Sequence, residues 1–457
     1  MLLRSTAPPS RADLAGVTHE IFWRDTEPVE PGPPLTETIE CDVAIVGGGY
    51  TGLWTAFHLK QAKPELRVQI VEADYAGAGA SGHNDGFVTP TIGHSLHTVV
   101  KQFGIEKARP AYAAVGRSIM ELRRFTRKHG VDAELEPNGF FLVGTNSGQM
   151  RRLNGDVALA AEMGVKYDVL DAAQAQEFIG SKAIQGALKT PGAVVNPHRL
   201  ARGLARVVRD LGVGVWENTP ALDLDRQGDR RVVVTRRGRL VADRVLLATN
   251  AYQHRWNSFK HTVKPVWSYA LVSEPLTDAQ MRRVHWPGRE GFVEARNYIT
   301  FGRFTAENRL LLGGGPAPYF YNREMDERHV RNLTVHDALA GDIGRWFPQW
   351  RDLRWDYSYG GCIAVTRDLI PHVGEVEPGV FYAYGYCGNG IAMTHAASKS
   401  LRDLLLGRDT DYTKLLYVNG DRPRFPPEPV SYFGARAATG VLAFQDRHPG
   451  LLRKQIV

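Results

Sequence analysis

The sequence has few cysteines: Cys41, Cys362 and Cys387 are the three among 457 residues. An odd number at scattered spacings argues against a disulfide framework, and no pair has the spacing of a metal site. Long hydrophobic runs are also missing, because no stretch approaches the roughly 18 consecutive apolar residues of a membrane-spanning helix. The N-terminal residues, with Arg4 and Arg11, lack the apolar core of a signal peptide. We therefore expect a cytoplasmic protein with no metal site and no integral membrane segment.

Charge of one sign is only slightly in excess. Lys and Arg number 56 against 49 Asp and Glu, which gives a formal net charge of +7. The basic residues are spread along the chain, and the clusters at 230–231 and 236–237 alternate with strand-like residues, as is typical of a solvated face. The composition therefore predicts no nucleic-acid partner. The excess still favours anionic ligands, and the length allows two or three domains.

The most informative segment that is present spans residues 41–72. Residues 43–46 have the branched, apolar content of a buried parallel strand, and they lead into Gly47-Gly48-Gly49-Tyr50-Thr51-Gly52, a G-x-G-x-x-G pattern. The pattern predicts a helix over 51–61 whose N-terminus faces a pyrophosphate, with Tyr50 and Thr51 beside the glycines. A further predicted strand, 68–71, ends on Glu72, a carboxylate that suits a ribose 2′-hydroxyl and disfavours NADP. The segment therefore predicts a Rossmann-like dinucleotide site.

A second glycine-rich junction lies near the other end of the chain. The predicted strand 380–384 leads into Gly385–Ile391 and then into a helix that runs to about residue 406. Two such junctions suit a cofactor with two ends, a pyrophosphate at the first and a ring with an anionic reduced form at the second. Between them, residues 76–87 are rich in glycine and predict an irregular loop that lies flat against a ligand.

Hydrophobic periodicity predicts a second, separate sheet. Helices are expected over 95–130, 147–163 and 198–211, and strands over 139–143, 213–216, 241–247, 267–273, 298–304 and 309–313. The fold class is therefore α/β with two domains, a Rossmann-like cofactor domain and a substrate domain built on a mixed, mainly antiparallel sheet. The predicted division is an N-terminal arm (1–39), a discontinuous cofactor domain (40–90, 190–255 and 355–410), a substrate domain (91–189 and 256–354) and a C-terminal tail (411–457).

Five segments together resemble one enzyme family. Gly47–Gly52 with Glu72, the loop 79–86, and segments 246–252, 366–374 and 385–391 are similar to the D-amino-acid-oxidase superfamily of FAD enzymes, in particular to γ-glutamylputrescine oxidoreductase-like amine oxidases. The resemblance implies oxidation of a C–N bond and FAD bound non-covalently or through His or Cys. It also implies a set of cofactor contacts: Ala80, Ser81, Gly82 and His83 beside the flavin, Thr249 and Asn250 at its border, Gly388, Asn389, Gly390 and Ile391 at its pyrimidine end, and Val194 and Ala221.

Departures from the family pattern favour an amine over an α-amino acid. Ile363 stands where α-amino-acid oxidases tend to carry an arginine, and Ala392 stands where sarcosine oxidases carry a lysine, so an α-carboxylate loses both charged partners. His83-Asn84-Asp85-Gly86 replaces the Arg-Asn-Gly-Gly of close relatives. Leu311 occupies the position of an oxygen-activating lysine, which leaves O2 or another electron acceptor open.

Six residues are candidates for the substrate side, each with an alternative. His83 is either attached to the flavin or stacked on it, or is an ordinary loop imidazole. Asp85 either binds the substrate ammonium or caps a turn. Arg303 holds a distal anion or lies on a solvated strand. His94, Tyr252 and Tyr386 either orient an amine or form an aromatic box, or they are core side chains, as most aromatic residues in such sheets are. Cys362 is either a second candidate for flavin attachment or a buried thiol.

The expected reaction moves hydride from the carbon beside a neutral amine nitrogen to flavin N5. The imine product hydrolyses to an aldehyde or ketone and an amine, and the rate rises with pH as the bound amine loses its proton. Two alternatives stay open: an amino-acid or alcohol oxidase or dehydrogenase of secondary metabolism on the same scaffold, and a non-catalytic flavin-binding protein.

Overall fold

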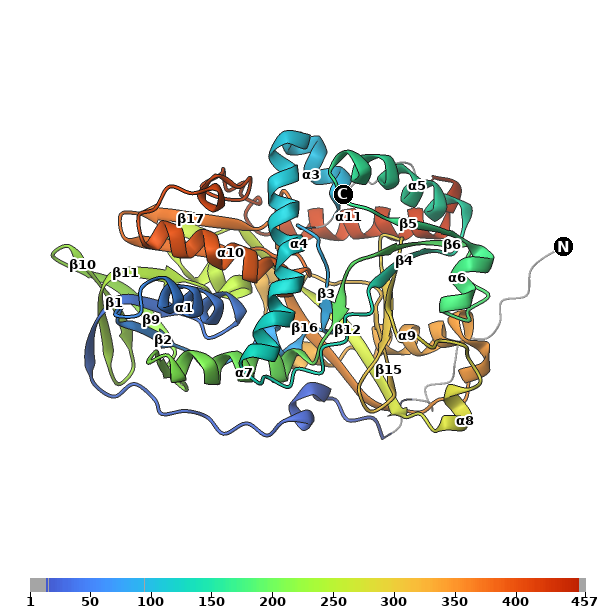
Figure 1. Cartoon of the computed structure of the whole chain (residues 1–457), viewed down its shortest axis with the longest axis horizontal. Coiled ribbons are helices and arrows are strands. Elements are labelled where there is room, and N and C mark those ends of the chain that lie inside the picture. Colours follow the sequence, from blue (N-terminus) through green and yellow to red (C-terminus); the bar gives the residue numbers. More distant parts are fainter. Residues whose placement is uncertain (1–13, 15, 94, 452–457) are drawn as a thin grey trace.

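The structure is a computed structural model that describes residue 14 and residues 16–93 and 95–451 (Figure 1). Two large sheets lie in separate halves of the molecule, and the long helix α4 (Ile105–Lys128) stands between them. None of its helices, within the described residues, is both long and apolar enough to cross a membrane.

The first sheet is built around β1 (Thr38–Val46). Its strand order is β17-β18-β11-β1-β2-β8, with β10 and β9 added beside β11. β1, β2, β8, β11 and β18 pair in parallel, whereas the β9–β10–β11 and β17–β18 pairs are antiparallel. The bounds of the other strands are β2 Val68–Val71, β8 Gly214–Trp216, β9 Ala221–Gln227, β10 Arg230–Thr235, β11 Arg239–Leu247, β17 His372–Glu377 and β18 Val380–Tyr384.

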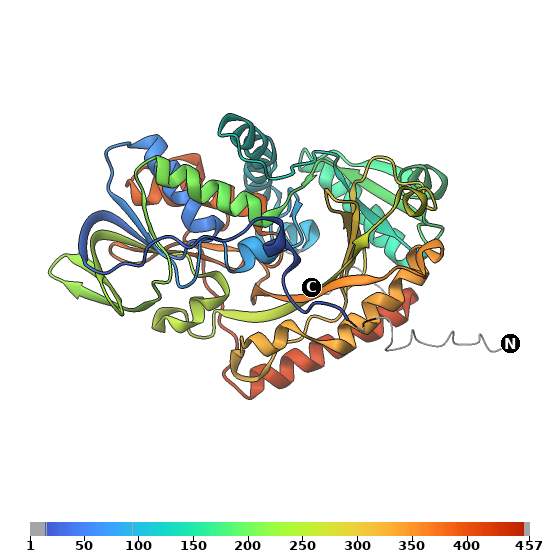
Figure 2. The same ribbon diagram turned by 90° about the horizontal axis from the view of Figure 1, so that it is seen from below.

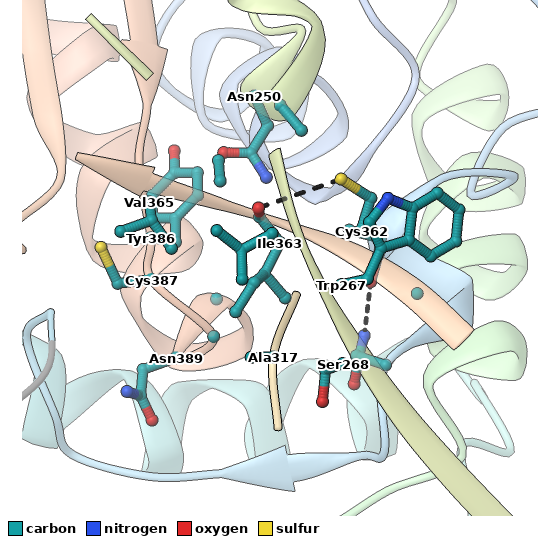
Figure 3. A pocket seen from close by; sticks show the side chains of 18 of the residues that line it. Asn250, Trp267, Ser268, Ala317, Cys362, Ile363, Val365, Tyr386, Cys387 and Asn389 are labelled. Carbon is teal, nitrogen blue, oxygen red and sulfur yellow. Dashed lines mark hydrogen bonds between the residues drawn. The ribbon is translucent and has the colours of Figure 1, made fainter. Parts of the chain in front are cut away.

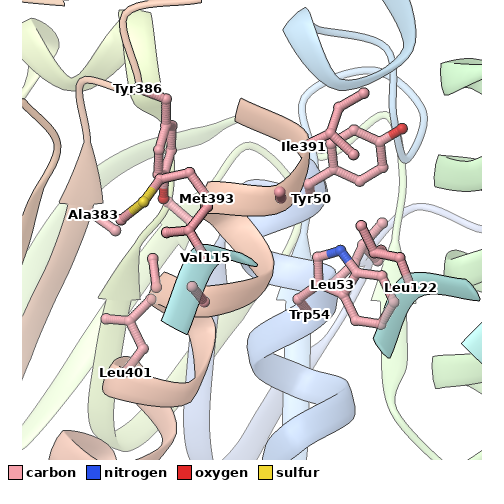
Figure 4. Close-up of a cluster of buried hydrophobic side chains, with 14 of the residues drawn as sticks. Tyr50, Leu53, Trp54, Val115, Leu122, Ala383, Tyr386, Ile391, Met393 and Leu401 are labelled. Carbon is pink, nitrogen blue, oxygen red and sulfur yellow. The ribbon is translucent and has the colours of Figure 1, made fainter. Parts of the chain in front are cut away.

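Helices α1 (Tyr50–Ala62), α7 (Pro197–Asp210) and α10 (Gly390–Leu405) cover one face of this sheet. Successive residues of β1 point to opposite faces, so Val43 and Ile45 join the core under these helices, while Ala44 and Val46 join the core on the other face. Figure 4 shows the first core, where α1 and α10 meet α4. Burying each large apolar side chain there contributes about 1.5–3 kcal/mol.

The second sheet has the order β16-β12-β15-β14-β13-β4-β6-β5. All of its pairs are antiparallel except β13 with β4. Its strands are β4 Phe140–Gly144, β5 Asp168–Asp171, β6 Gly186–Thr190, β12 Val263–Pro275, β13 Gly291–Glu294, β14 Thr300–Phe304, β15 Arg309–Gly314 and β16 Trp355–Thr366. The remaining helices are α2 Ala80–His83, α3 Leu96–Phe103, α5 Ser147–Glu162, α6 Ala172–Phe178, α8 Asp278–Met281, α9 Leu333–Trp346 and α11 Val430–Arg447.

The predicted α/β class with two sheets is confirmed, and most predicted elements lie within a few residues of their observed bounds. The glycine-rich segment 76–87 is more regular than predicted. It contains the short helix α2, and its end forms β3 (Phe87–Val88), which pairs with β7 (Ala193–Val194) in a two-stranded sheet.

Three observed elements bear on the predicted division of the chain. β16 lies within the range predicted for the cofactor domain, and it pairs with β12 of the second sheet along its whole length. The predicted arm contains a 3-10 turn, Phe22–Thr26, whose Trp23 is fully buried and packs with strands of the second sheet. The predicted tail contains α11, which Figure 2 shows in red along one side of the molecule.

Candidate active site

One cavity of about 1660 Å³ extends from the carboxyl end of β2, past the start of α10, to the inner face of α11. Its walls come from both sheets, with Glu72 at one end and Leu442 of α11 at the other. Drug-sized ligands occupy roughly 300–1,000 Å³, so this cavity has room for a larger cofactor together with a substrate.

The first glycine turn forms the narrow end of the cavity. Gly47 has a φ of 112°, and a Cβ on it would lie 2.6 Å from the Ala248 carbonyl oxygen. A Cβ on Gly52 would overlap the Gly47 carbonyl oxygen, so α1 approaches the end of β1 closely only because residue 52 is glycine. The Tyr50 N–H donates to Ser81 Oγ at 2.8 Å, which ties the turn to α2.

Glu72 closes the same end of the cavity. Its carboxylate accepts the Gly48 N–H at 2.6 Å and the Asp74 N–H at 3.1 Å. Burial raises the pKa of Glu72 above its ordinary value, whereas these backbone donors act in the opposite direction. The carboxylate is therefore fixed beside the glycine turn, where the sequence predicts that it meets a ribose.

The second glycine junction lies directly beside the first. The Tyr386 hydroxyl is 2.8 Å from Thr51 Oγ1, so the two turns are joined by a buried hydrogen bond. Gly385, Cys387 and Gly388 all have positive φ, and the Gly385 N–H donates to Asn250 Oδ1 at 3.1 Å. α10 begins at Gly390 and therefore directs its N-terminal amide groups at the cavity.

Asn389 orders the strand-to-helix turn from the side. Its Nδ2 donates to the Gly93 carbonyl at 2.7 Å, and its Oδ1 accepts from Thr89 Oγ1 at 3.1 Å. Figure 3 shows Asn389, Cys387 and Tyr386 near Ile363 and Val365 of β16. Burial raises the pKa of the Cys387 thiol to about 11 and that of the Cys362 thiol to about 12, so both are held as neutral thiols.

His83, the last residue of α2, lies on the cavity wall. Arg24, from the N-terminal segment, lies with its Nη2 3.4 Å from His83 Nε2, and since an arginine only donates, this nitrogen accepts. Burial, with Arg24 next in size, lowers the pKa of His83 to about 3. His83 is therefore a neutral imidazole at physiological pH.

Asp85 lies two residues beyond His83 and faces the same cavity. Its Oδ1 accepts from the Tyr359 hydroxyl at 2.9 Å, and its other oxygen has no hydrogen-bond partner among the described residues. Burial raises the pKa of Asp85 to about 7, although Tyr359 and Arg303 oppose the shift. The wall thus holds one buried acid that titrates close to neutral pH.

Sequence reasoning missed much of the far wall of the cavity. Trp267, Tyr269 and Tyr319 line it from β12 and the segment after β15. Lys264, also on β12, donates to the Ser431 carbonyl at 2.8 Å and lies 4.3 Å from the centre of the Tyr319 ring. Burial lowers the pKa of Lys264 to about 8. Only the alternation along β12 could have indicated these inward side chains, and it does not distinguish a cavity from a core.

Most of the predicted site residues lie on the cavity wall. The wall includes Gly47, Gly49, Tyr50, Thr51, Glu72, Ala80, Ser81, His83, Asp85, Ala221, Thr249, Asn250, Tyr252, Tyr386, Gly388, Asn389, Gly390 and Ile391. Gly52 and Gly82 lie behind it and act through close packing, because a Cβ on either would meet a backbone carbonyl. His94 lies outside the described residues.

Two predicted site residues are placed elsewhere. Arg303 is 1% exposed and lies behind the wall, with its guanidinium donating to the carbonyls of Val195 at 2.7 Å and of Phe304 at 3.0 Å. Its Nε and Nη1 groups therefore already have buried backbone acceptors, which favours a structural role for this cation over binding of a substrate anion. Val194 pairs with Phe87 in the small sheet and is buried away from the cavity.

The residues fit FAD on grounds of shape. Two glycine turns joined by a buried hydrogen bond lie side by side, each at the N-terminus of a buried helix, and Ser81 of α2 is hydrogen-bonded to the first of them. A parallel sheet with a Rossmann glycine turn, facing a second sheet across one cavity, defines the class of dinucleotide-binding oxidoreductases.

Comparison with known proteins identifies the family. Residues 42–404 match the family of FAD dependent oxidoreductases, and the chain belongs to this family. It is 30% identical over 382 residues to the γ-glutamylputrescine oxidoreductase of Escherichia coli (strain K12), covering 82% of this chain and 86% of that protein. It is 27% identical over 380 residues to the glycine oxidase of Geobacillus kaustophilus, covering 81% and 94%.

Solved structures share the fold. The glycine oxidase of G. kaustophilus superposes with a TM-score of 0.68 at 23% identity, covering 81% of this chain and 96% of that one. The L-α-glycerophosphate oxidase of Mycoplasma pneumoniae, solved with FAD bound, superposes with a TM-score of 0.65 at 15% identity. The match covers 84% of this chain and 100% of that one.

Proposed function

We propose that this FAD-dependent oxidoreductase oxidises the C–N bond of an amine to an imine, which hydrolyses to an aldehyde or ketone. The observation that carries the proposal is the Asp85 carboxylate, which lies on the cavity wall two residues beyond the end of α2. One of its oxygens has no hydrogen-bond partner among the described residues. A carboxylate attracts an ammonium group and repels an α-carboxylate.

The residues around Asp85 favour an amine substrate for a second reason. Ile363 and Val365 present apolar side chains to the cavity at the end of β16, where α-amino-acid oxidases are expected to carry an arginine. An apolar surface stabilises the neutral amine relative to its ammonium form. FAD would supply the oxidising chemistry by accepting a hydride.

Within this proposal Asp85 receives the proton of the entering ammonium at its free oxygen, while Tyr359 holds the other oxygen in place. A pKa of about 7 gives the group acceptor capacity at neutral pH. Glu72 and the Gly47–Gly52 turn would hold the adenosine and pyrophosphate, and the start of α10 would stabilise negative charge on the ring.

The test is anaerobic bleaching of the purified yellow protein by a panel of amines, amino acids and alcohols. We expect bleaching by amines, with a rate that rises with pH. Bleaching by alcohols alone, or flavin reduction that does not change between pH 6 and pH 10, contradicts the proposal. Protein that stays colourless with excess FAD contradicts the cofactor assignment as well.

An α-amino acid is the second candidate substrate, and Lys264 is the observation that favours it. Its ammonium lies on the cavity wall and is able to meet a carboxylate if it leaves Ser431. Bleaching by glycine or other amino acids that is lost in Lys264→Met, while amines stay inactive, would establish this alternative.

The mode of FAD attachment follows from one measurement. His83 is the candidate residue for a covalent bond to the flavin, and its Nδ1 has no hydrogen-bond partner in the part of the chain that the structure describes. After acid precipitation, flavin in the pellet that is lost in His83→Ala establishes the covalent bond. Flavin in the supernatant restricts His83 to a neutral neighbour of the cofactor.

We also infer a cytoplasmic location and an acceptor other than O2. Leu311 is fully buried in the core formed by Trp23, Phe301 and Tyr359, so no lysine occupies the position expected for oxygen activation. Stopped-flow mixing of the reduced protein with air-saturated buffer tests the second inference, which fast reoxidation contradicts.

A further inference from the structure

The outer face of α11 carries a row of exposed apolar side chains. Val430, Phe433, Val441 and Phe444 are 61%, 65%, 52% and 52% exposed, and the exposed Ala437 lies between the two pairs. At about 100° per residue, these positions fall within a sector of about 80°, the narrow stripe typical of a helix that packs on another helix. α11 lies along one side of the molecule (Figure 2), and among the described residues nothing covers this outer row.

The outer row is large enough to form an interface. A phenylalanine side chain presents 150–250 Å², so two phenylalanines and two valines at these exposures leave roughly 400 Å² of apolar surface along about 21 Å of helix. Single exposed apolar side chains are ordinary, whereas a continuous patch of this size marks a site of interaction. With the small residues between them, a second copy would cover roughly 600 Å² of each chain, a total close to the 1,200 Å² at which specific interfaces begin.

The order of the outer row is symmetric about Ala437. Phe433 and Val441 lie four residues to either side of it, and Val430 and Phe444 lie seven residues to either side. When two identical helices pair antiparallel across a two-fold axis at Ala437, each residue meets the residue at the same distance on the opposite side. Phe433 then packs on Val441 of the second copy, and Val430 packs on Phe444, so every ring meets a smaller side chain. A membrane surface or an unrelated protein does not require this order.

The residues near the axis allow the two helices to approach closely. Gly434 and Gly440 have open space where a Cβ would lie, and Ala437 adds one methyl group. The nearest charge, Arg436, is held to the flank, where its guanidinium donates to the Tyr432 hydroxyl at 3.1 Å and lies 5.7 Å from the centre of that ring. Because this arginine is exposed, salt screens its repulsion from the same residue of the second copy. The centre of the contact is therefore small and apolar.

From this row we infer that the protein forms a two-fold symmetric dimer, in which α11 of one copy packs antiparallel on α11 of a second copy. The opposite face of α11, with Ala435 and Thr439, lines the cavity, and Val430 belongs to both surfaces. The interface therefore reaches the rim of the cavity, where Phe444 of the second copy would lie against Val430. The inference is independent of the proposed chemistry, since it depends on the outer face of α11 alone.

The experiment measures the mass of the full-length holoenzyme by sedimentation equilibrium. We expect twice the 50.7 kDa of one chain at micromolar concentration. Phe433→Glu and Val441→Arg each place a charge against an apolar side chain of the second copy, so each should raise the dissociation constant of the dimer at least about 100-fold. Val169→Glu on β5 is the matched control, because Val169 is 52% exposed like Val441, and it should leave the dissociation constant unchanged.

The double variant that carries both Phe433→Glu and Val441→Arg tests the geometry. In the antiparallel pairing about Ala437 the new acid meets the new base of the second copy, so the dissociation constant should return to within about 10-fold of the wild-type value. A wild type that stays monomeric up to about 100 µM, a dimer that both single variants leave intact, or a double variant that stays monomeric overturns the inference. Binding of a monomeric wild type to phosphatidylglycerol vesicles that the Phe433→Glu variant loses would assign the row to a membrane surface instead, and it also overturns the dimer.

Discussion

At the scale of single residues, the site depends on where burial leaves a charge without a partner. Asp85, which is half-buried, and Arg303, which is fully buried, are ionisable groups on neighbouring segments, yet only Asp85 faces the cavity. Arg303 donates from Nε and Nη1 to backbone carbonyls, whereas the Asp85 side chain has one hydrogen bond and a free oxygen. The sequence predicted both as functional, because residue type and loop position do not reveal which donors are already satisfied.

Replacement of Asp85 tests the proton acceptor. In Asp85→Asn we expect the rate constant for flavin reduction by an amine to fall about 100-fold. In the wild type the carboxylate is protonated below its pKa of about 7, so kcat/KM should fall as the pH falls through 7, and the variant should lose this step. Asp132→Asn, an exposed carboxylate paired with Arg199, is the matched control. If the dependence of kcat/KM on pH is unchanged in Asp85→Asn, Asp85 is not the proton acceptor of the reaction.

Replacement of Arg303 tests the structural assignment. Arg303→Met leaves the carbonyl of Val195 without its donor and removes a charge stacked over Trp23, so the free energy of unfolding should fall by about 3–5 kcal/mol. Chemical denaturation of the holoenzyme measures this loss. The affinity of the folded fraction for an amine should stay within about twofold. A stable variant with weakened binding of anionic substrates would restore the role first predicted for Arg303.

At the scale of elements, the sequence revealed the parts that are fixed locally. Both glycine junctions were predictable because each is a strand, a turn and a helix in succession. In the first, glycine is required where another backbone approaches, and in the second, Gly385 and Gly388 have positive φ. The placement of α11 and of Lys264 on the cavity wall was not predictable, since it arises from contacts between segments far apart in the chain. Asp446 of α11 accepts the N–H groups of Asn297 and Tyr298, which places the helix along the cavity.

A pair of glycine substitutions tests the fit of the first junction. In Gly52→Ala the new methyl group would overlap the Gly47 carbonyl, so α1 must move away from β1, and we expect loss of FAD and a markedly lower melting temperature. Gly116→Ala, within α4 and with open space at its Cβ, should be neutral or stabilising by up to about 1 kcal/mol. Flavin content and melting temperature of the two purified variants measure the difference. Full FAD content in Gly52→Ala contradicts the packing argument.

At the scale of the whole molecule, the helices that cover the first sheet share a core that contains ionisable groups. His58 of α1 and His395 of α10 are both buried, with ring centres 5.0 Å apart, and Trp54 packs against both. His395 Nδ1 lies 3.1 Å from Ser118 Oγ of α4, so the pair lies where the three helices meet. Burial lowers the pKa of His395 to about 3 and that of His58 well below its ordinary value.

These histidines predict that the fold weakens in mild acid. Since the folded-state pKa lies below the value of about 6.5 in the unfolded chain, the unfolded state binds more protons between the two values. Stability is therefore complete above pH 6.5 and is lost progressively as the pH falls toward 3, at about 1.4 kcal/mol for each unit of pKa difference. Melting temperatures of wild type and His395→Gln between pH 7.5 and pH 5 measure the effect. The melting temperature of the wild type should fall more than that of the variant over this range, because the variant no longer has that site to protonate. Parallel curves would show that His395 does not contribute to the pH dependence of stability.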